Sequence, residues 1–121
     1  AEAAALFLLR RENAPDPLPG EVVELSGPEV LTGESVAAIW SEVLGRPVAY
    51  AGDDLAAFEQ QSRAQMPGWL AYDTALMFRG FQRSGMLPGP GAVAELTRLL
   101  GHPPRSYRSF AEEMAAQWRD K

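Results

Sequence analysis

The chain has 121 residues, of which 46% are hydrophobic and 22% charged, a balance typical of one globular domain. Its net charge of −5, without a basic cluster, argues against nucleic acid as a partner. The absence of cysteine excludes disulfides and thiolate metal sites and fits a reducing compartment, so we expect a cytoplasmic protein. The longest apolar run, residues 3–9, is too short to cross a bilayer, and we expect no membrane partner.

The first predicted helix, residues 1–12, is apolar on every side. A surface helix shows one apolar stripe, so all-round apolarity predicts burial on more than one face, against a missing domain, a partner or a second copy. Residue 1 is Ala rather than Met, and no capping residue precedes the helix. We therefore expect a fragment of a larger chain; normal removal of an initiator Met is the alternative.

Residues 21–50 predict a strand, a helix and a second strand. The first strand is the β-prone run 22–25, which ends at a Ser-Gly-Pro turn, and the second is 48–50. Thr32 is placed to cap the helix and Gly45 to end it in a left-handed conformation. One face of this helix is apolar: Val36, Ile39, Trp40, Val43 and Leu44. A helix between two strands implies a parallel pair, which needs further strands and cover that this chain does not supply.

Four more helices are predicted after the second strand. One runs over residues 55–65 with Asp53 or Asp54 as its cap, and one over 68–83. A short helix ends at Leu100, and the last begins near Ser106 or Ser109. The buried face of the last helix is expected to carry Phe110, Met114 and Trp118. The fold class predicted is α/β, mostly helical, with about five helices and a two-stranded parallel pair, in a single lobe over residues 1–121.

No constellation of residues predicts catalysis, a bound cofactor or a metal. The segment 89–94 matches G-x-G-x-x-A, but no strand is predicted before it, as a dinucleotide site requires. The only lysine is Lys121, and no tyrosine stands four residues before it, so a tyrosine–lysine catalytic pair is absent. His102, the sole histidine, is interpreted as a solvent-facing loop residue, and the paired carboxylates 53–54 and 112–113 as capping residues.

The helix over residues 68–83 carries the one ambiguous feature, a broad aromatic and methionine-rich face. Its side chains can serve as plain core, which we favour, or as the wall of an apolar pocket for a flat ligand. The candidate substrate-pocket residues are Met66, Trp69, Tyr72, Met77, Phe78 and Phe81.

Several short segments resemble the C-terminal part of the NmrA-like family of atypical short-chain dehydrogenases. They are residues 25–29 (LSGPE), 31–36 (LTGESV), 44–50 (LGRPVAY) and 100–106 (LGHPPRS), followed by a helix with Phe110 in place. Residues 67–70 (PGWL) are similar to the start of the helix that closes the substrate site in that family. The resemblance extends over residues 1–118 and depends on the order and spacing of these segments, because no single one is diagnostic.

The resemblance implies a substrate-binding lobe that is not catalytic alone. In the family an N-terminal Rossmann domain binds NAD(P), and members are reductases, such as quinone reductases, or redox sensors. This chain has no G-x-x-G-x-x-G after a strand, so NAD(P)H is expected only for the full-length parent, and a small apolar or aromatic substrate for the lobe. The alternative is a self-contained, non-catalytic interaction module that docks a partner or self-associates through its apolar N-terminal helix.

Overall fold

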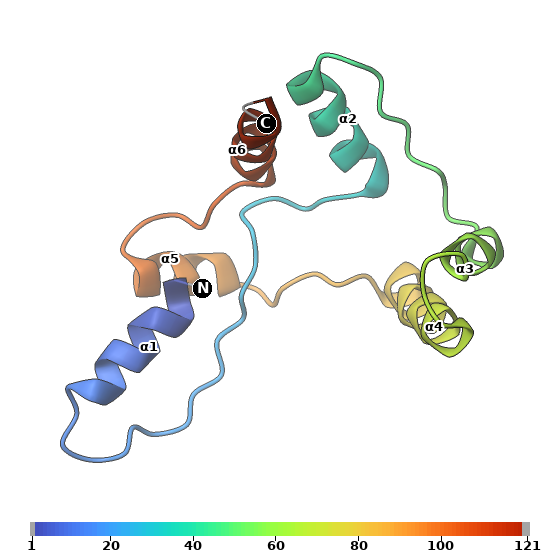
Figure 1. The fold of residues 1–121 in the computed structure, drawn as a ribbon. Helices are drawn as coiled ribbons and strands as arrows, with labels where there is room; N and C mark the ends of the chain where they lie inside the picture. The colour runs from blue at the N-terminus through green and yellow to red at the C-terminus, as the bar shows by residue number, and fades with distance from the viewer. Residues whose placement is uncertain (1, 120–121) are drawn as a thin grey trace. The chain divides into compact units, whose positions relative to one another are not determined.

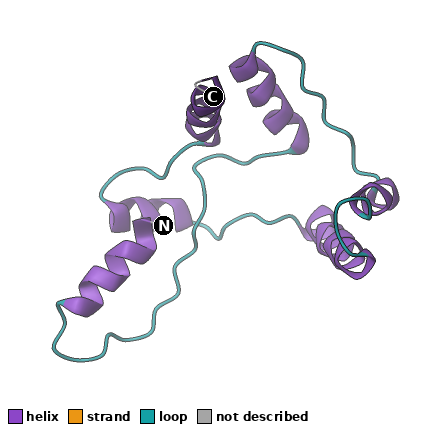
Figure 2. Cartoon of the chain, in the orientation of Figure 1, coloured by secondary structure: helices purple, strands orange, loops and turns teal. Residues whose placement is uncertain are grey.

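The computed structural model describes residues 2–119, and within that range the chain is all-α (Figures 1 and 2). The helices in chain order are α1 (Glu2–Glu12), α2 (Gly33–Leu44), α3 (Leu55–Ser62), α4 (Gly68–Ser84), α5 (Ala92–Leu100) and α6 (Tyr107–Arg119). They pack as three pairs, α1 with α5, α2 with α6 and α3 with α4. The α3–α4 pair forms a compact unit of residues 49–87, and the other two pairs belong to a second unit, residues 2–48 and 88–119.

The predicted α/β fold is wrong, because neither β-prone run forms a strand in the described range. Val22 is 93% exposed and has no neighbouring strand. At the second run, the backbone N–H of Val48 donates to the hydroxyl of Ser41, 2.9 Å away. The one hydrogen of that hydroxyl faces two carbonyls, that of Ala37 at 2.8 Å and that of Val48 at 3.1 Å. A side chain of α2 thus accepts the backbone N–H that a strand partner would have used.

The helix ends follow local capping signals, and several of the predicted caps are confirmed. The Thr32 hydroxyl accepts from the Ser35 N–H at 3.2 Å, and the Ser35 hydroxyl accepts from the Thr32 N–H at 2.8 Å, a reciprocal capping box. Asp54, rather than Asp53, caps α3 by accepting two backbone N–H groups. Gly45 ends α2 at φ 64°, in the left-handed region where glycine is least strained.

At the last helix, Ser106 provides the cap, and its hydroxyl accepts from the Ser109 N–H at 3.1 Å. The buried face of this helix differs from the one predicted. Ala111 and Ala115 are buried, whereas Phe110 is 39% exposed and Trp118 more so. Small side chains in the centre allow two helices to approach closely, and the larger ones then lie along the flanks of the contact.

Small side chains also make up most of the remaining described core. Its buried residues are seven alanines and one leucine: Ala3, Ala37, Ala71, Ala75, Ala92, Leu96, Ala111 and Ala115. An alanine side chain removes little apolar surface from water, so each pair depends on contacts at its flanks as well as on its centre. The large apolar side chains therefore divide into those with a partner across a helix pair and those left at the surface.

Candidate binding surfaces

The predicted substrate-pocket residues lie on α4 and on the turn before it, and they differ in exposure and contacts. On α4, Ala71 and Ala75 are buried against α3, and Phe78 meets Phe58 of α3 edge to face at 5.2 Å between ring centroids. Phe81 lies 6.1 Å from Phe78, again edge to face. These two phenylalanines pack within the α3–α4 unit without being buried, since Phe78 is 38% exposed and Phe81 is half-buried. Met66, in the turn before α4, is half-buried.

A second set of these residues is exposed. Trp69 is 67% exposed and Tyr72 50%, and Leu76 continues their line along the helix at i, i+3 and i+7. Met77 is 48% exposed on the other flank of α4. We call Trp69, Tyr72 and Leu76 the α4 aromatic stripe. It is an exposed apolar surface, and its aromatic rings have flat faces to offer a ligand.

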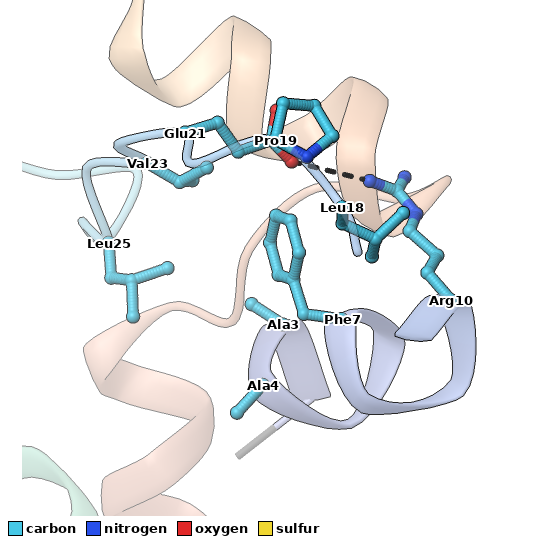
Figure 3. A pocket seen from close by; sticks show the side chains of 9 residues that line it. All are labelled: Ala3, Ala4, Phe7, Arg10, Leu18, Pro19, Glu21, Val23 and Leu25. Carbon is cyan, nitrogen blue, oxygen red and sulfur yellow. Dashed lines mark ion pairs between the residues drawn. The ribbon is translucent and has the colours of Figure 1, made fainter. Parts of the chain in front are cut away.

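A cavity of about 400 Å³ lies elsewhere, between α1 and the extended segment that follows it (Figure 3). Small-molecule sites have volumes of roughly 300–1,000 Å³, so this one is large enough for a small ligand. Its lining residues are Ala3, Ala4, Phe7, Arg10, Leu18, Pro19, Glu21, Val23 and Leu25. We call it the α1 pocket.

The walls of the α1 pocket follow from simple periodicities. Ala3, Phe7 and Arg10 stand at i, i+4 and i+7 and therefore share one face of α1. In extended backbone successive side chains alternate, so Glu21, Val23 and Leu25 point to one side. Figure 3 shows them on the side of α1, with the Phe7 ring between the two walls. The sequence analysis did not predict this pocket, and its sequence signal is a helical periodicity followed by an extended one in the next segment.

The α1 pocket has one charged end. The Arg10 guanidinium and the Glu21 carboxylate are 3.6 Å apart (Nη1 to Oε1), with each side chain about half exposed. Such a surface pair contributes roughly 0–1 kcal/mol to stability, so a ligand can displace it at little cost. The guanidinium carbon also lies 5.2 Å from the centroid of the Phe7 ring, where the ring face attracts a cation.

The residues weighed for other chemistry have structural partners. Gly89, in the G-x-G-x-x-A segment, donates its backbone N–H to the Glu24 carboxylate at 2.7 Å. Glu113 forms an ion pair with Arg105 at 2.5 Å, rather than the capping contact that the sequence predicted for it. His102 is exposed as expected, but it also contacts Glu2 at 2.7 Å.

Residues 2–119 contain neither a metal-ligand cluster nor a membrane-spanning helix. No cluster of three or more histidine, aspartate or glutamate side chains is placed to hold a metal ion, and none of the helices in that range has the length and apolarity needed to cross a membrane. Comparison of the chain with protein-family models, curated proteins and solved structures gives no match.

Proposed function

We propose that this chain is the substrate-binding lobe of an NmrA-like NAD(P)-dependent oxidoreductase or redox sensor, and that it is not catalytic alone. The observation that carries the proposal is the α4 aromatic stripe. It begins at Trp69, inside the PGWL segment that resembles the start of the family's substrate-closing helix. An exposed tryptophan and tyrosine one helical turn apart present apolar ring faces for a flat substrate.

The proposal assigns hydride transfer and NAD(P)H binding to a Rossmann domain that these 121 residues do not contain. The lobe then contributes apolar contact to the substrate and no titratable group to the reaction. Its alanine-centred α3–α4 pair supports this role, because α4 uses one face for packing and keeps the stripe for the ligand.

The test is an NMR titration that follows the indole N–H signals of the three tryptophans. We expect 1,4-naphthoquinone to shift the Trp69 signal, assigned with Trp69→Phe, and to leave those of Trp40 and Trp118 in place as internal controls. NADPH should shift none of the three. Binding of NADPH at micromolar concentration, or a Trp69 signal that naphthoquinone leaves unmoved, would overturn the proposal.

A second candidate function is a self-contained interaction module, and the exposed leucines of α1 favour it. Leu8 is 71% exposed and Leu9 54%, on a helix whose other face already packs against α5. In this case the chain self-associates or docks a partner through α1. Sedimentation should then show a dimer that Leu8→Glu dissociates, while Leu87→Glu, at a leucine 68% exposed beyond α4, leaves it intact.

A further inference from the structure

The α1 pocket is an open apolar hollow with one end that carries both a hydrogen-bond donor and an acceptor. Its floor and walls are alanine, phenylalanine, leucine, proline and valine side chains (Figure 3). Arg10 and Glu21 are the only charged residues among those that line it. The site therefore suits a ligand that has an apolar body and a single small polar group.

The charges at that end discriminate between polar groups. The 3.6 Å separation of Arg10 and Glu21 exceeds the usual N–H···O hydrogen-bond length. Within residues 2–119, the two side chains are linked to each other only by this longer ion pair, so the guanidinium keeps N–H donors and the carboxylate keeps acceptor oxygens. A hydroxyl group, which both donates and accepts, can satisfy both partners. A carboxylate is attracted by Arg10 and repelled by Glu21, and an ammonium group the reverse. The two charges therefore largely offset each other for either ion, while the cost of removing that ion from water remains.

We propose that the α1 pocket binds a small apolar alcohol or phenol, with the hydroxyl group between Arg10 and Glu21. The hydroxyl accepts a hydrogen bond from the guanidinium and donates one to the carboxylate. The apolar body lies against Phe7 and the Val23–Leu25 wall. This proposal does not depend on the function proposed for the α4 aromatic stripe, because it concerns other residues and a different ligand group.

Three probes with the same eight-carbon chain test it: octan-1-ol, octanoate and octylamine, titrated at neutral pH. The readout is the set of backbone amide NMR signals of residues 3–25, which gives both the location and the dissociation constant. We expect octan-1-ol to bind at least about fivefold more tightly than either charged probe, because a charged group loses hydration here without a net electrostatic gain. Equal or tighter binding of octanoate or octylamine, or shifts confined to α4, would overturn the proposal.

Two substitutions that remove one charge each should favour one charged probe each. Glu21→Gln should raise octanoate affinity by about five- to tenfold, and Arg10→Gln should raise octylamine affinity by a similar factor. Arg11→Gln, on the next residue of α1 and outside the pocket lining, is the matched control and should change neither. If both pocket variants alter the two charged probes alike, the hydroxyl assignment is wrong.

The apolar wall has its own matched pair. Phe7→Ala should weaken octan-1-ol binding about tenfold or more, while Leu87→Ala, at an exposed leucine beyond α4 and outside the lining, should leave it unchanged. Far-UV circular dichroism of each variant checks that α1 is retained. Equal losses from the two variants, or a second copy of the chain that occupies the pocket and excludes octan-1-ol in sedimentation experiments, would reject the site.

Discussion

The α2–α6 and α3–α4 pairs have similar centres and different flanks. Each has a helix with two buried alanines one turn apart, Ala111 and Ala115 in α6 and Ala71 and Ala75 in α4. The α2–α6 pair joins segments far apart in the chain, whereas α3 and α4 are neighbours connected by a short turn. A long-range pair closes a larger loop and needs more interaction to offset the entropy lost.

The flanks of α2–α6 supply that interaction. Trp40 stacks on Trp118 with ring centroids 5.4 Å apart and an interplanar angle of 14°. Its indole N–H also donates to the Tyr107 hydroxyl at 3.0 Å. Arg108 pairs with Glu42 at 2.5 Å. In the α3–α4 unit, by contrast, Trp69 is left exposed. Trp40 and Trp118 therefore contribute to the contact between two helices, whereas Trp69 presents most of its surface to solvent.

The largest expected effect comes from Trp40→Ala, which removes the stack, the hydrogen bond to Tyr107 and the apolar contact together. We expect a loss of about 2–3 kcal/mol in the free energy of unfolding, measured by urea denaturation followed by far-UV circular dichroism. Trp69→Ala is the matched change in the other unit and should cost less than about 0.5 kcal/mol. Similar losses at the two sites would show that the exposed tryptophan also stabilises the fold.

The next effect concerns Phe78, the aromatic residue that does hold α3–α4 together. Because α3 has only eight residues, it depends on packing against α4 to remain helical. Phe78→Ala should cost about 1–2 kcal/mol, which corresponds to a 5–30-fold faster amide hydrogen exchange in α3. Met77→Ala, at the adjacent exposed side chain, is the control. An α3 exchange rate that Phe78→Ala leaves unchanged would contradict the packing role of the Phe58–Phe78 contact.

A smaller effect concerns the cap of α2, and it should be confined to the unit that contains α2. Thr32→Ala breaks the capping box of α2 and should cost about 1 kcal/mol, visible as faster exchange in α2 and not in α3. Thr32→Ser keeps the hydroxyl and should retain most of the stability. Faster exchange of α3 as well would mean that the two units unfold together.

The sequence predicted the helices and their ends well because those signals are local. Thr32 and Gly45 each act within one helical turn, and the structure confirms both. The strands were wrong because a strand exists only if a distant segment pairs with it. The backbone N–H of Val48 donates to the side chain of Ser41, seven residues away, and Val22 has no strand beside it in the described range.

The candidate site shows the same limit. Periodicity placed Trp69, Tyr72 and Phe78 on one helix, but it could not say which of them would face α3. Only the packed structure shows that Phe78 contacts Phe58 of α3, whereas Trp69 is 67% exposed. The α1 pocket needs two segments with different periodicities to meet, and neither the helix nor the residue 21–25 run indicates the other by itself.

The smallest effect concerns the third pair, α1–α5, and it is the only one here that should respond to pH near neutrality. Nε2 of His102, beyond the end of α5, lies 2.7 Å from the Glu2 carboxylate, and Nδ1 lies 2.8 Å from the Pro103 carbonyl. Both ring nitrogens thus face oxygen acceptors, which favours the doubly protonated ring. The hydrogen bond to Glu2, then the one to Pro103 and the charge of Glu2, raise the pKa of His102 above its usual value of 6.5.

Since the pKa is raised in the folded state, the contact stabilises α1 fully below about pH 6.5 and is lost as the pH rises through the raised value. Glu2→Gln should return the His102 pKa toward 6.5, measured from the single histidine ring signal by NMR. Protection factors of the α1 amides should fall as the pH rises from 6.5 through the raised pKa of His102, while those of α6 should not, because its ion pair with α2, Arg108–Glu42, contains no histidine. A fall of equal size in Glu2→Gln would show that the pH dependence of α1 has another source than this contact.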